Sequence, residues 1–246
     1  MDKVKTGISG LDEMLNGGVP AGNQVYVCGG PGTGKTSLGM EYLYRGAKMG
    51  EKGLFFSLEE DPEQITRVFS TVFSDWKDLK SMMDSKQIVI AGQESYIHLE
   101  KAVGGQGGGN TAGYAFSRLT GAITGIITEN KVKRVVIDSS NIIKLFFDND
   151  MQFRRTMLAL LKQLKKLGCT TFVTGEIQSL ERGGIVFDAE HFLADGLIML
   201  YNIQQQEKRL SAIEVVKMRS TAHSRSLTPL KITSNGLNVY VGEKVY

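Results

Sequence analysis

Residues 29–36 read Gly-Gly-Pro-Gly-Thr-Gly-Lys-Thr, and this octapeptide decides the fold of the 246-residue chain. It fits the pattern G-x-x-x-x-G-K-[ST], in which glycines let backbone N–H groups turn inward around phosphate oxygens. An apolar segment, 24–28, precedes the octapeptide, and a helical pattern, 37–43, follows it. This strand–loop–helix context favours a phosphate-binding loop over an ordinary glycine-rich turn.

The loop also predicts which residues contact the phosphates. Lys35 is expected to reach the β- and γ-phosphates, and the hydroxyl of Thr36 to be a ligand of Mg²⁺. The helix that follows directs the positive end of its dipole at the anion. We therefore expect the phosphates to be bound by Gly30, Pro31, Gly32, Thr33, Gly34, Lys35, Thr36 and Ser37.

The composition is that of a globular protein, with 41% hydrophobic and 22% charged residues. A net charge of +3 is too small to indicate a nucleic-acid partner by itself. Cys28 and Cys169 lie in or beside apolar segments, so we expect buried thiols and a reducing, cytoplasmic location. The first residues lack the apolar region of a secretory signal, and no apolar window is long enough to predict a membrane span.

Apolar strands alternate with helical patterns along most of the chain. We predict strands over 24–28, 54–58, 88–91, 134–138 and 170–174. The helical patterns cover 63–73, about 119–130 and 153–164, and Asp61 with Pro62 predicts the start of the first. Continuous apolar strands that alternate with helices indicate an α/β fold with a parallel sheet covered on both faces.

The last quarter of the chain has a different pattern. Strand-like segments predict an antiparallel extension on one edge of the same sheet, with Asn235-Gly236 as a hairpin turn. These segments are 196–201, 211–218, 230–233 and 237–241. Because no linker separates the parts, we expect one domain over 1–246. The glycine-rich stretch 104–113 predicts a mobile loop, either a flexible connector or a partner- or pore-facing loop.

Three carboxylates follow predicted strands. Asp138 ends an apolar strand, where it could hold Mg²⁺ or merely cap the next turn, and its place downstream of a phosphate loop favours the metal. Glu59 and Glu60 follow another strand, and ligands gather at the carboxyl ends of parallel strands. Either glutamate could act as the general base that activates water, or both could open the helix that begins near Asp61.

Two cations, Lys217 and Arg219, stand at spacing that puts them on the same side of a strand. A phosphate between them would relieve their repulsion, and arginine can donate two bonds to it. A solvated face of an edge strand is the equally open alternative.

Six motifs in order resemble those of a KaiC-like ATPase of the RecA superfamily. The resemblance covers nearly the whole chain, and its motifs lie at 6–20, 29–36, 57–60, 135–139, 192–196 and 217–223. It implies a RecA-like fold, ATP and Mg²⁺ as ligands, and a homo-oligomeric ring, commonly a hexamer, with ATP at each subunit boundary. Lys217 and Arg219 would then reach the neighbouring γ-phosphate, and His223 would contact the same nucleotide. Ser220 departs from the pattern, where the family often has glycine.

Three functions remain open on this basis. The first is an ATPase that acts as a regulatory or assembly switch with an unknown protein partner. The second is a non-hydrolysing nucleotide-binding scaffold of a motility or signalling complex. The presence of Glu59, Glu60, Asp138, Lys217 and Arg219 argues against it. The third is a DNA recombinase relative. Segments 141–150 and 175–184, which would have to bind DNA, carry too few cations to bind a phosphate backbone well, which argues against this function. No segment resembles the phosphorylated Ser/Thr segment of the two-domain circadian-clock members of this family, so a circadian or autokinase role is not indicated.

Overall fold

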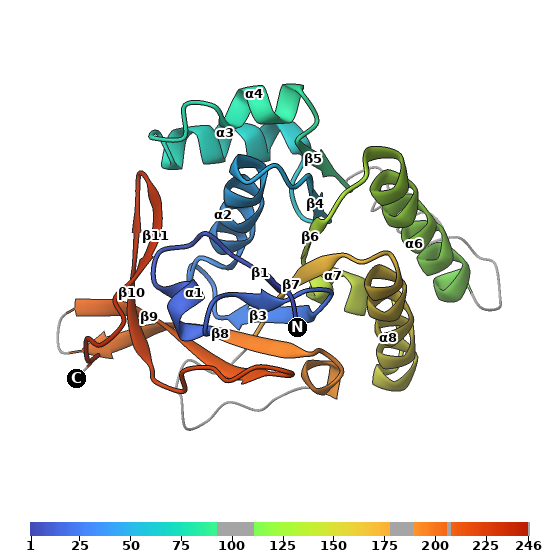
Figure 1. Ribbon diagram of the computed structural model, residues 1–246. Coiled ribbons are helices and arrows are strands. Elements are labelled where there is room, and N and C mark those ends of the chain that lie inside the picture. The colour runs from blue at the N-terminus through green and yellow to red at the C-terminus, as the bar shows by residue number, and fades with distance from the viewer. Residues whose placement is uncertain (93–110, 178–188, 206–207, 246) are drawn as a thin grey trace.

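The computed structural model describes residues 1–92, 111–177, 189–205 and 208–245. Its centre is a nine-stranded sheet in the order β11-β10-β9-β8-β3-β7-β6-β4-β5 (Figure 1). In chain order these strands are β3 (Gln24–Gly29), β4 (Gly53–Ser57), β5 (Ile88–Ala91), β6 (Arg134–Asp138), β7 (Thr170–Glu176), β8 (Gly196–Gln205), β9 (Lys208–Met218), β10 (Thr228–Thr233) and β11 (Gly236–Val239). Each strand predicted from the sequence is confirmed. A separate antiparallel pair joins β1 (Lys3–Val4) to β2 (Val19–Pro20).

The six strands β8-β3-β7-β6-β4-β5 are all parallel to one another. Every residue of β3, β4 and β6 is buried, because helices cover both faces of this part of the sheet. The expected α/β fold with a mainly parallel sheet is therefore confirmed, and so is its antiparallel extension through β9, β10 and β11.

The prediction was wrong about the position of β8. We expected 196–201 to belong to the antiparallel extension, but β8 pairs parallel with β3 on one edge and antiparallel with β9 on the other. The strand begins beside Val25 and so starts at the same end of the sheet as β3. Single-strand patterns carry no information about direction, since both directions bury the same side chains.

Two hydrophobic cores lie on opposite faces of the sheet. The first packs against α1 (Leu11–Met14), α2 (Lys35–Lys48), α3 (Pro62–Val72) and α4 (Leu79–Asp84). The second packs against α6 (Thr111–Asn130), α7 (Ser140–Lys144) and α8 (Asp150–Lys166). The 3-10 helix η2 (Ala189–Phe192) contacts α8. Cys28 and Cys169 lie in this second core as buried free thiols, as predicted.

The glycine-rich stretch differs in part from its prediction. Residues 104–110 lie outside the described part of the chain, so the expected loop is untested there. Residues 111–113, however, begin α6 rather than continuing a loop. A single glycine costs a helix about 1 kcal/mol, and a helix of 20 residues offsets that loss through burial of Leu119 and Ile123.

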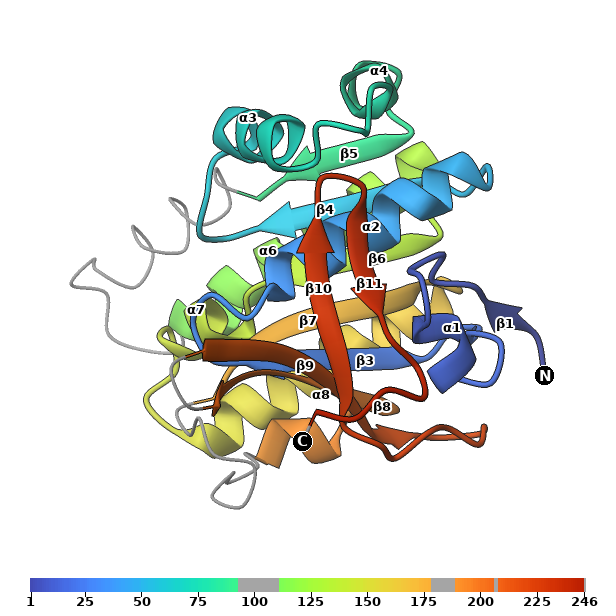
Figure 2. The same cartoon turned by 90° about the vertical axis from the view of Figure 1, so that its left-hand side faces the viewer.

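The β10–β11 hairpin crosses over α2 on the first face of the sheet (Figure 2). Its turn is made by Ser234 and Asn235, one residue earlier than the predicted Asn235-Gly236, because Gly236 already pairs with Thr233. Gly236 has a φ of 120°, and a Cβ at this position would lie 2.3 Å from the carboxylate of Glu41. The turn is therefore set by its contact with α2 as well as by its own sequence.

Candidate functional site

The loop between β3 and α2 closes around the side chain of its own lysine. Lys35 Nζ donates hydrogen bonds to the carbonyl oxygens of Gly29 at 3.1 Å and Gly30 at 3.0 Å. Thr33 Oγ1 donates to the same Gly30 carbonyl at 2.8 Å, which fixes the width of the loop. Gly32 and Gly34 have φ angles of 70° and 95°, a region that glycine enters without steric cost. The backbone therefore adopts the conformation that the sequence pattern predicts.

The first turn of α2 is the anion-binding end of this loop. Gly34 is the N-cap and offers no side-chain bond to the N–H groups that follow. Those groups, which lack partners within the helix, remain for a ligand, and the dipole of a 14-residue helix favours a negative charge there. Thr36 and Ser37 are half-buried in this turn. The geometry suits phosphate oxygens.

Asp138 lies at the carboxyl end of β6 and is only 6% exposed. Burial raises the pKa of its carboxyl group, and hydrogen bonds from Thr174 and Thr36 and the charge of Lys35 lower it. The nearby negative charge of Glu59 raises the pKa further. Asp138, Thr36, Lys35 and Glu59 therefore share one neighbourhood, although they are far apart in the sequence.

The two glutamates after β4 have different surroundings. Ser57 Oγ accepts hydrogen bonds from the backbone N–H groups of Glu59 at 3.3 Å and Glu60 at 3.0 Å, which shapes the turn after the strand. The hydroxyl of Ser139 donates to Glu59 Oε1, so the Glu59 side chain lies beside the residue that follows Asp138. The cap of α3 is Asp61, which accepts from the N–H groups of Glu63 and Gln64. Capping therefore does not require either glutamate.

Lys217 and Arg219 lie in a different place. Lys217 is on β9 opposite Leu197, but β9 ends at Met218, so the prediction that both cations lie on one strand is wrong. Lys217 Nζ donates to the carbonyl oxygen of Ala194 at 2.6 Å. Burial lowers the pKa of Lys217, and the charge of Arg219 lowers it further. The Arg219 side chain is 54% exposed, with its guanidinium 3.8 Å from Asp195.

The residues around the phosphate loop and the cations Lys217 and Arg219 lie at opposite ends of the parallel strands. Gly196 pairs with Val25 near the start of β3, whereas Leu200 pairs with Gly29 at its end, where the phosphate loop begins. Four strand residues separate these levels by about 13 Å. Lys217, opposite Leu197 and next to Gly196, therefore lies at the end of the strands remote from the phosphate loop of its own chain.

His223 belongs to the segment that follows Arg219. Its Nδ1 lies 3.0 Å from the carbonyl oxygen of Ser224, and the N–H of Ser224 donates to Met14 in α1. The Lys3 ammonium donates to Thr221 Oγ1 at 2.7 Å. His223, which we expected to contact the nucleotide, therefore lies at the same end of the molecule as Lys217, away from the loop at Lys35.

Sequence reasoning missed two polar residues that organise these ends. Thr174, in β7, donates to Asp138 and orients its carboxylate. Asp195 accepts from Lys165 Nζ at 2.8 Å and from the backbone N–H of Gln24 at 3.2 Å while it lies beside Arg219. A threonine at the end of a predicted strand was a signal for the first, and the motif at 192–196 was a signal for the second.

No group of three or more His, Cys, Asp or Glu side chains could hold a metal ion in the part of the chain that the structure describes. A magnesium ion that takes its other ligands from phosphates and water needs only one or two protein ligands, and Thr36 with Asp138 fits that chemistry. Among the described helices, none combines the length and the apolar character needed to cross a membrane.

Comparison with known proteins gives one consistent result. A family model described as "ATPase: KaiC" matches residues 4–244. A UPF0273 protein from Methanopyrus kandleri is 36% identical over 245 residues, which cover 97% of this chain and 92% of that protein. The circadian clock oscillator protein KaiC of Parathermosynechococcus lividus is 35% identical over 240 residues, but the match spans only 42% of its length. The crystal structure of a KaiC-like protein from Pyrococcus horikoshii superposes with a TM-score of 0.78 at 31% identity and covers 97% of this chain and 99% of that one.

Proposed function

This chain belongs to the KaiC family of ATPases, and we propose that it binds ATP with Mg²⁺ and hydrolyses it at the boundary between two copies of itself. The observation that carries the proposal is the convergence of Lys35, Thr36 and Glu59 on the buried carboxylate of Asp138. These side chains come from the ends of two separate strands, β4 and β6, and from the first turn of α2. A packing requirement alone gives no reason to gather them around a desolvated charge.

Each residue then has a distinct task. The N–H groups of the loop and the ammonium of Lys35 bind the phosphate oxygens, while Thr36 and Asp138 hold the metal. Mg²⁺, when bound, neutralises charge on the phosphates. Glu59 is the better placed general base, since its carboxylate already lies beside Ser139 at the same strand end. Glu60 is the second candidate for that task.

The remaining charge stabilisation comes from a second copy. Lys217, Arg219 and His223 lie too far from their own loop to contact its nucleotide, but a neighbour related by rotation can place them there. An arginine supplied in this way stabilises the charge of the phosphoryl-transfer transition state. We therefore propose a homo-oligomeric ring, a hexamer, that responds to ATP as a regulatory or assembly switch. The buried free thiols fit a reducing compartment such as the cytoplasm.

A turnover assay tests the chemistry. Phosphate release from ATP should require Mg²⁺ and should fall by about 10²-fold or more in Glu59→Gln, with a smaller loss in Glu60→Gln. ATP binding should persist in both variants, because neither side chain holds the phosphates. Wild-type protein that binds ATP without any Mg²⁺-dependent turnover would instead identify the non-hydrolysing scaffold.

A measurement of mass in solution tests the assembly. Light scattering with Mg²⁺ and a non-hydrolysable ATP analogue should show a nucleotide-dependent ring for the wild type and a weakened one for Arg219→Ala. Arg67→Ala, which removes an exposed arginine from α3, is the matched control and should leave the ring intact. A monomer that binds the analogue with unchanged mass would contradict the boundary site.

A further inference from the structure

A groove opens where β10 separates from β9. The two strands pair only at Thr228 with Ile213 and at Pro229 with Ala212, after which β10 leaves the sheet to pair with β11 over α2 (Figure 2). The groove that results has a volume of about 630 Å³. It is lined by β9 residues 209–211, β10 residues 229–232, Tyr240 and tail residues 243–245. A volume of this size is within the usual range for ligand sites.

One edge of β9 is free along this groove. Residues 208–211 pair with β8 on their other edge, and the described part of the chain offers them no strand on the groove side. In a strand, alternate residues direct their N–H and C=O groups to each edge. The groove therefore exposes backbone donors and acceptors in the geometry that a further strand would satisfy.

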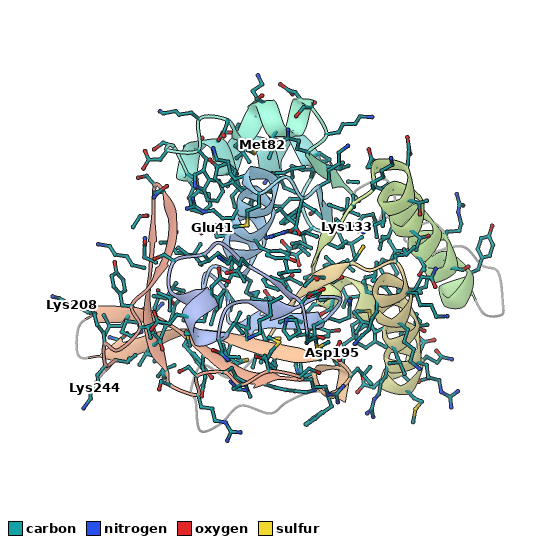
Figure 3. The ribbon with its side chains drawn as sticks, viewed as in Figure 1. Glu41, Met82, Lys133, Asp195, Lys208 and Lys244 are labelled. Atoms are coloured by element: carbon teal, nitrogen blue, oxygen red, sulfur yellow. The ribbon has the colours of Figure 1, made fainter. Side chains whose placement is uncertain are left out.

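The charges along the groove are mostly positive. Arg209, Lys231 and Lys244 line it with a single described carboxylate, Glu243. All three cations are exposed, and none forms an ion pair within the described ranges. Figure 3 shows Lys208 and Lys244 projecting from the same side of the molecule. An acidic ligand is the complement of this surface.

Apolar side chains lie between these cations. Ile232 and Tyr240 are each 37% exposed, and Leu210 is half-buried beside them. Ile232 also lies against the phosphate loop, since a Cβ on Gly34 would be 2.8 Å from its Cδ1. Charges alone could serve to protect a free strand edge from aggregation. Protection gives no reason for a groove floored with exposed apolar groups.

We propose that this groove binds an extended acidic segment of a partner protein, which adds to the free edge of β9 as a further strand. Backbone hydrogen bonds to β9 supply the common part of the affinity, and alternate side chains supply specificity. Acidic residues face Arg209, Lys231 and Lys244, and the apolar residues between them pack on Leu210, Ile232 and Tyr240. None of these side chains belongs to the candidate catalytic set, although Ile232 lies against Gly34 of the phosphate loop.

Peptide binding to the full chain tests the proposal. The probe is an array of octapeptides with Asp or Glu at every second position and apolar residues between them, followed by fluorescence anisotropy on the best binders. The double variant Arg209→Glu with Lys231→Glu should weaken binding by at least about tenfold, since it reverses two of the facing charges. The matched control is Lys77→Glu with Lys80→Glu, which changes the net charge equally at exposed positions near and within α4 and should bind as the wild type does.

A second pair of measurements tests the strand geometry. Bound peptide should slow hydrogen exchange at amides of 209–211, and the same peptide with alternate N-methylated amides should lose its binding. No binding from the array, equal binding of peptides with Lys in place of the acidic residues, or unchanged affinity after N-methylation would each overturn the proposal. A concentration-dependent dimer that the groove variant dissolves would assign the groove to a second copy of the chain and would overturn it as well.

Discussion

At the scale of single residues, Asp138 shows how a functional group opposes stability. Its carboxylate is desolvated at the end of β6, and this burial raises its pKa. A raised pKa means that the folded state binds the proton more readily than the unfolded chain does. Stability linked to this group is therefore present below the unfolded pKa of about 4 and is lost as pH rises through the folded pKa.

Asp138→Asn should therefore separate stability from activity. Without nucleotide, and in a chelator, the variant should melt at or above the wild-type temperature at pH 8, because the buried charge is removed while Thr174 keeps an acceptor. The difference in melting temperature should shrink as the pH approaches 5. Mg²⁺-dependent turnover should fall by about 10²-fold or more, since a neutral amide is a poor ligand for Mg²⁺. A variant that melts well below the wild type at pH 8 would show that the carboxylate is needed for packing instead.

Ser220 carries a second prediction at this scale. It has a φ of 68°, although it is not glycine, and it follows Arg219 directly. The family pattern predicted a glycine here, and the backbone conformation explains that preference in physical terms. The departure in sequence has thus left the turn in the conformation that glycine favours.

Substitutions at Ser220 should follow that conformation. Ser220→Gly should change the free energy of unfolding by less than about 1 kcal/mol, because relief of strain is offset by the greater freedom of the unfolded chain. Ser220→Val should destabilise by about 1–2 kcal/mol, since a β-branched residue resists a positive φ. Chemical denaturation measures both changes, with Ser81→Val in the exposed part of α4 as the control for β-branching alone. Equal losses at the two positions would remove the conformational explanation.

At the scale of elements, the position of the β10–β11 hairpin depends on one buried carboxylate. Glu41 is fully buried on α2, and its Oε2 accepts the backbone N–H of Leu237 at 2.6 Å. Arg45 pairs with Glu41 at 2.9 Å and donates to the Asn235 carbonyl oxygen at 2.7 Å. Figure 3 shows Glu41 on the side of α2 that faces the hairpin. Burial raises the pKa of Glu41, although the bond from Leu237 and the charge of Arg45 oppose this effect.

Removal of the carboxylate should release the hairpin. Glu41→Ala should destabilise by about 2–4 kcal/mol, because it leaves the Leu237 N–H and the Arg45 guanidinium without their buried acceptor. Glu41→Gln should lose less, since its amide oxygen can still accept from Leu237. Trp76 is the only tryptophan of the chain and donates to the Asn235 carbonyl at 3.1 Å, so its emission reports the hairpin directly. A red shift in Glu41→Ala that precedes global unfolding is the expected result, and unchanged emission and stability would contradict it.

Periodicity predicted most elements but not the contacts between them. The strands of 24–29, 134–138 and 170–176 are apolar enough to be recognised alone, as are helices with one buried face. The pair β1–β2 was missed because each strand has only two residues. Its segment is instead held by Asp12, which accepts from the N–H and hydroxyl of Thr6. Such contacts depend on tertiary neighbours that no local pattern encodes.

At the scale of the whole molecule, the two halves of one proposed site lie at opposite ends of the parallel strands. The sequence alone placed Lys35, Asp138 and Glu59 together, because parallel strands gather their carboxyl ends at one edge. A contact of Lys217 and Arg219 with a neighbouring nucleotide was expected only from the resemblance to a family of ring-forming ATPases. The structure adds that these cations lie near Asp195, at the end of β8 and β9 remote from the loop. A single chain therefore holds a phosphate-binding end and a cationic end that do not meet.

Mixing two inactive variants should restore turnover if those ends meet across a boundary. Glu59→Gln keeps the cationic end intact, and Arg219→Ala keeps the loop and its general base intact. In a randomly mixed ring, about one quarter of the boundaries would join an intact loop to an intact cationic end, so activity should recover to about one quarter of the wild type. Each variant alone should stay near zero, and a mixture of Glu59→Gln with the double variant Glu59→Gln and Arg219→Ala should stay there too. If the first mixture also remains inactive while light scattering shows mixed rings, then the cations act on their own chain, and the site does not lie between copies.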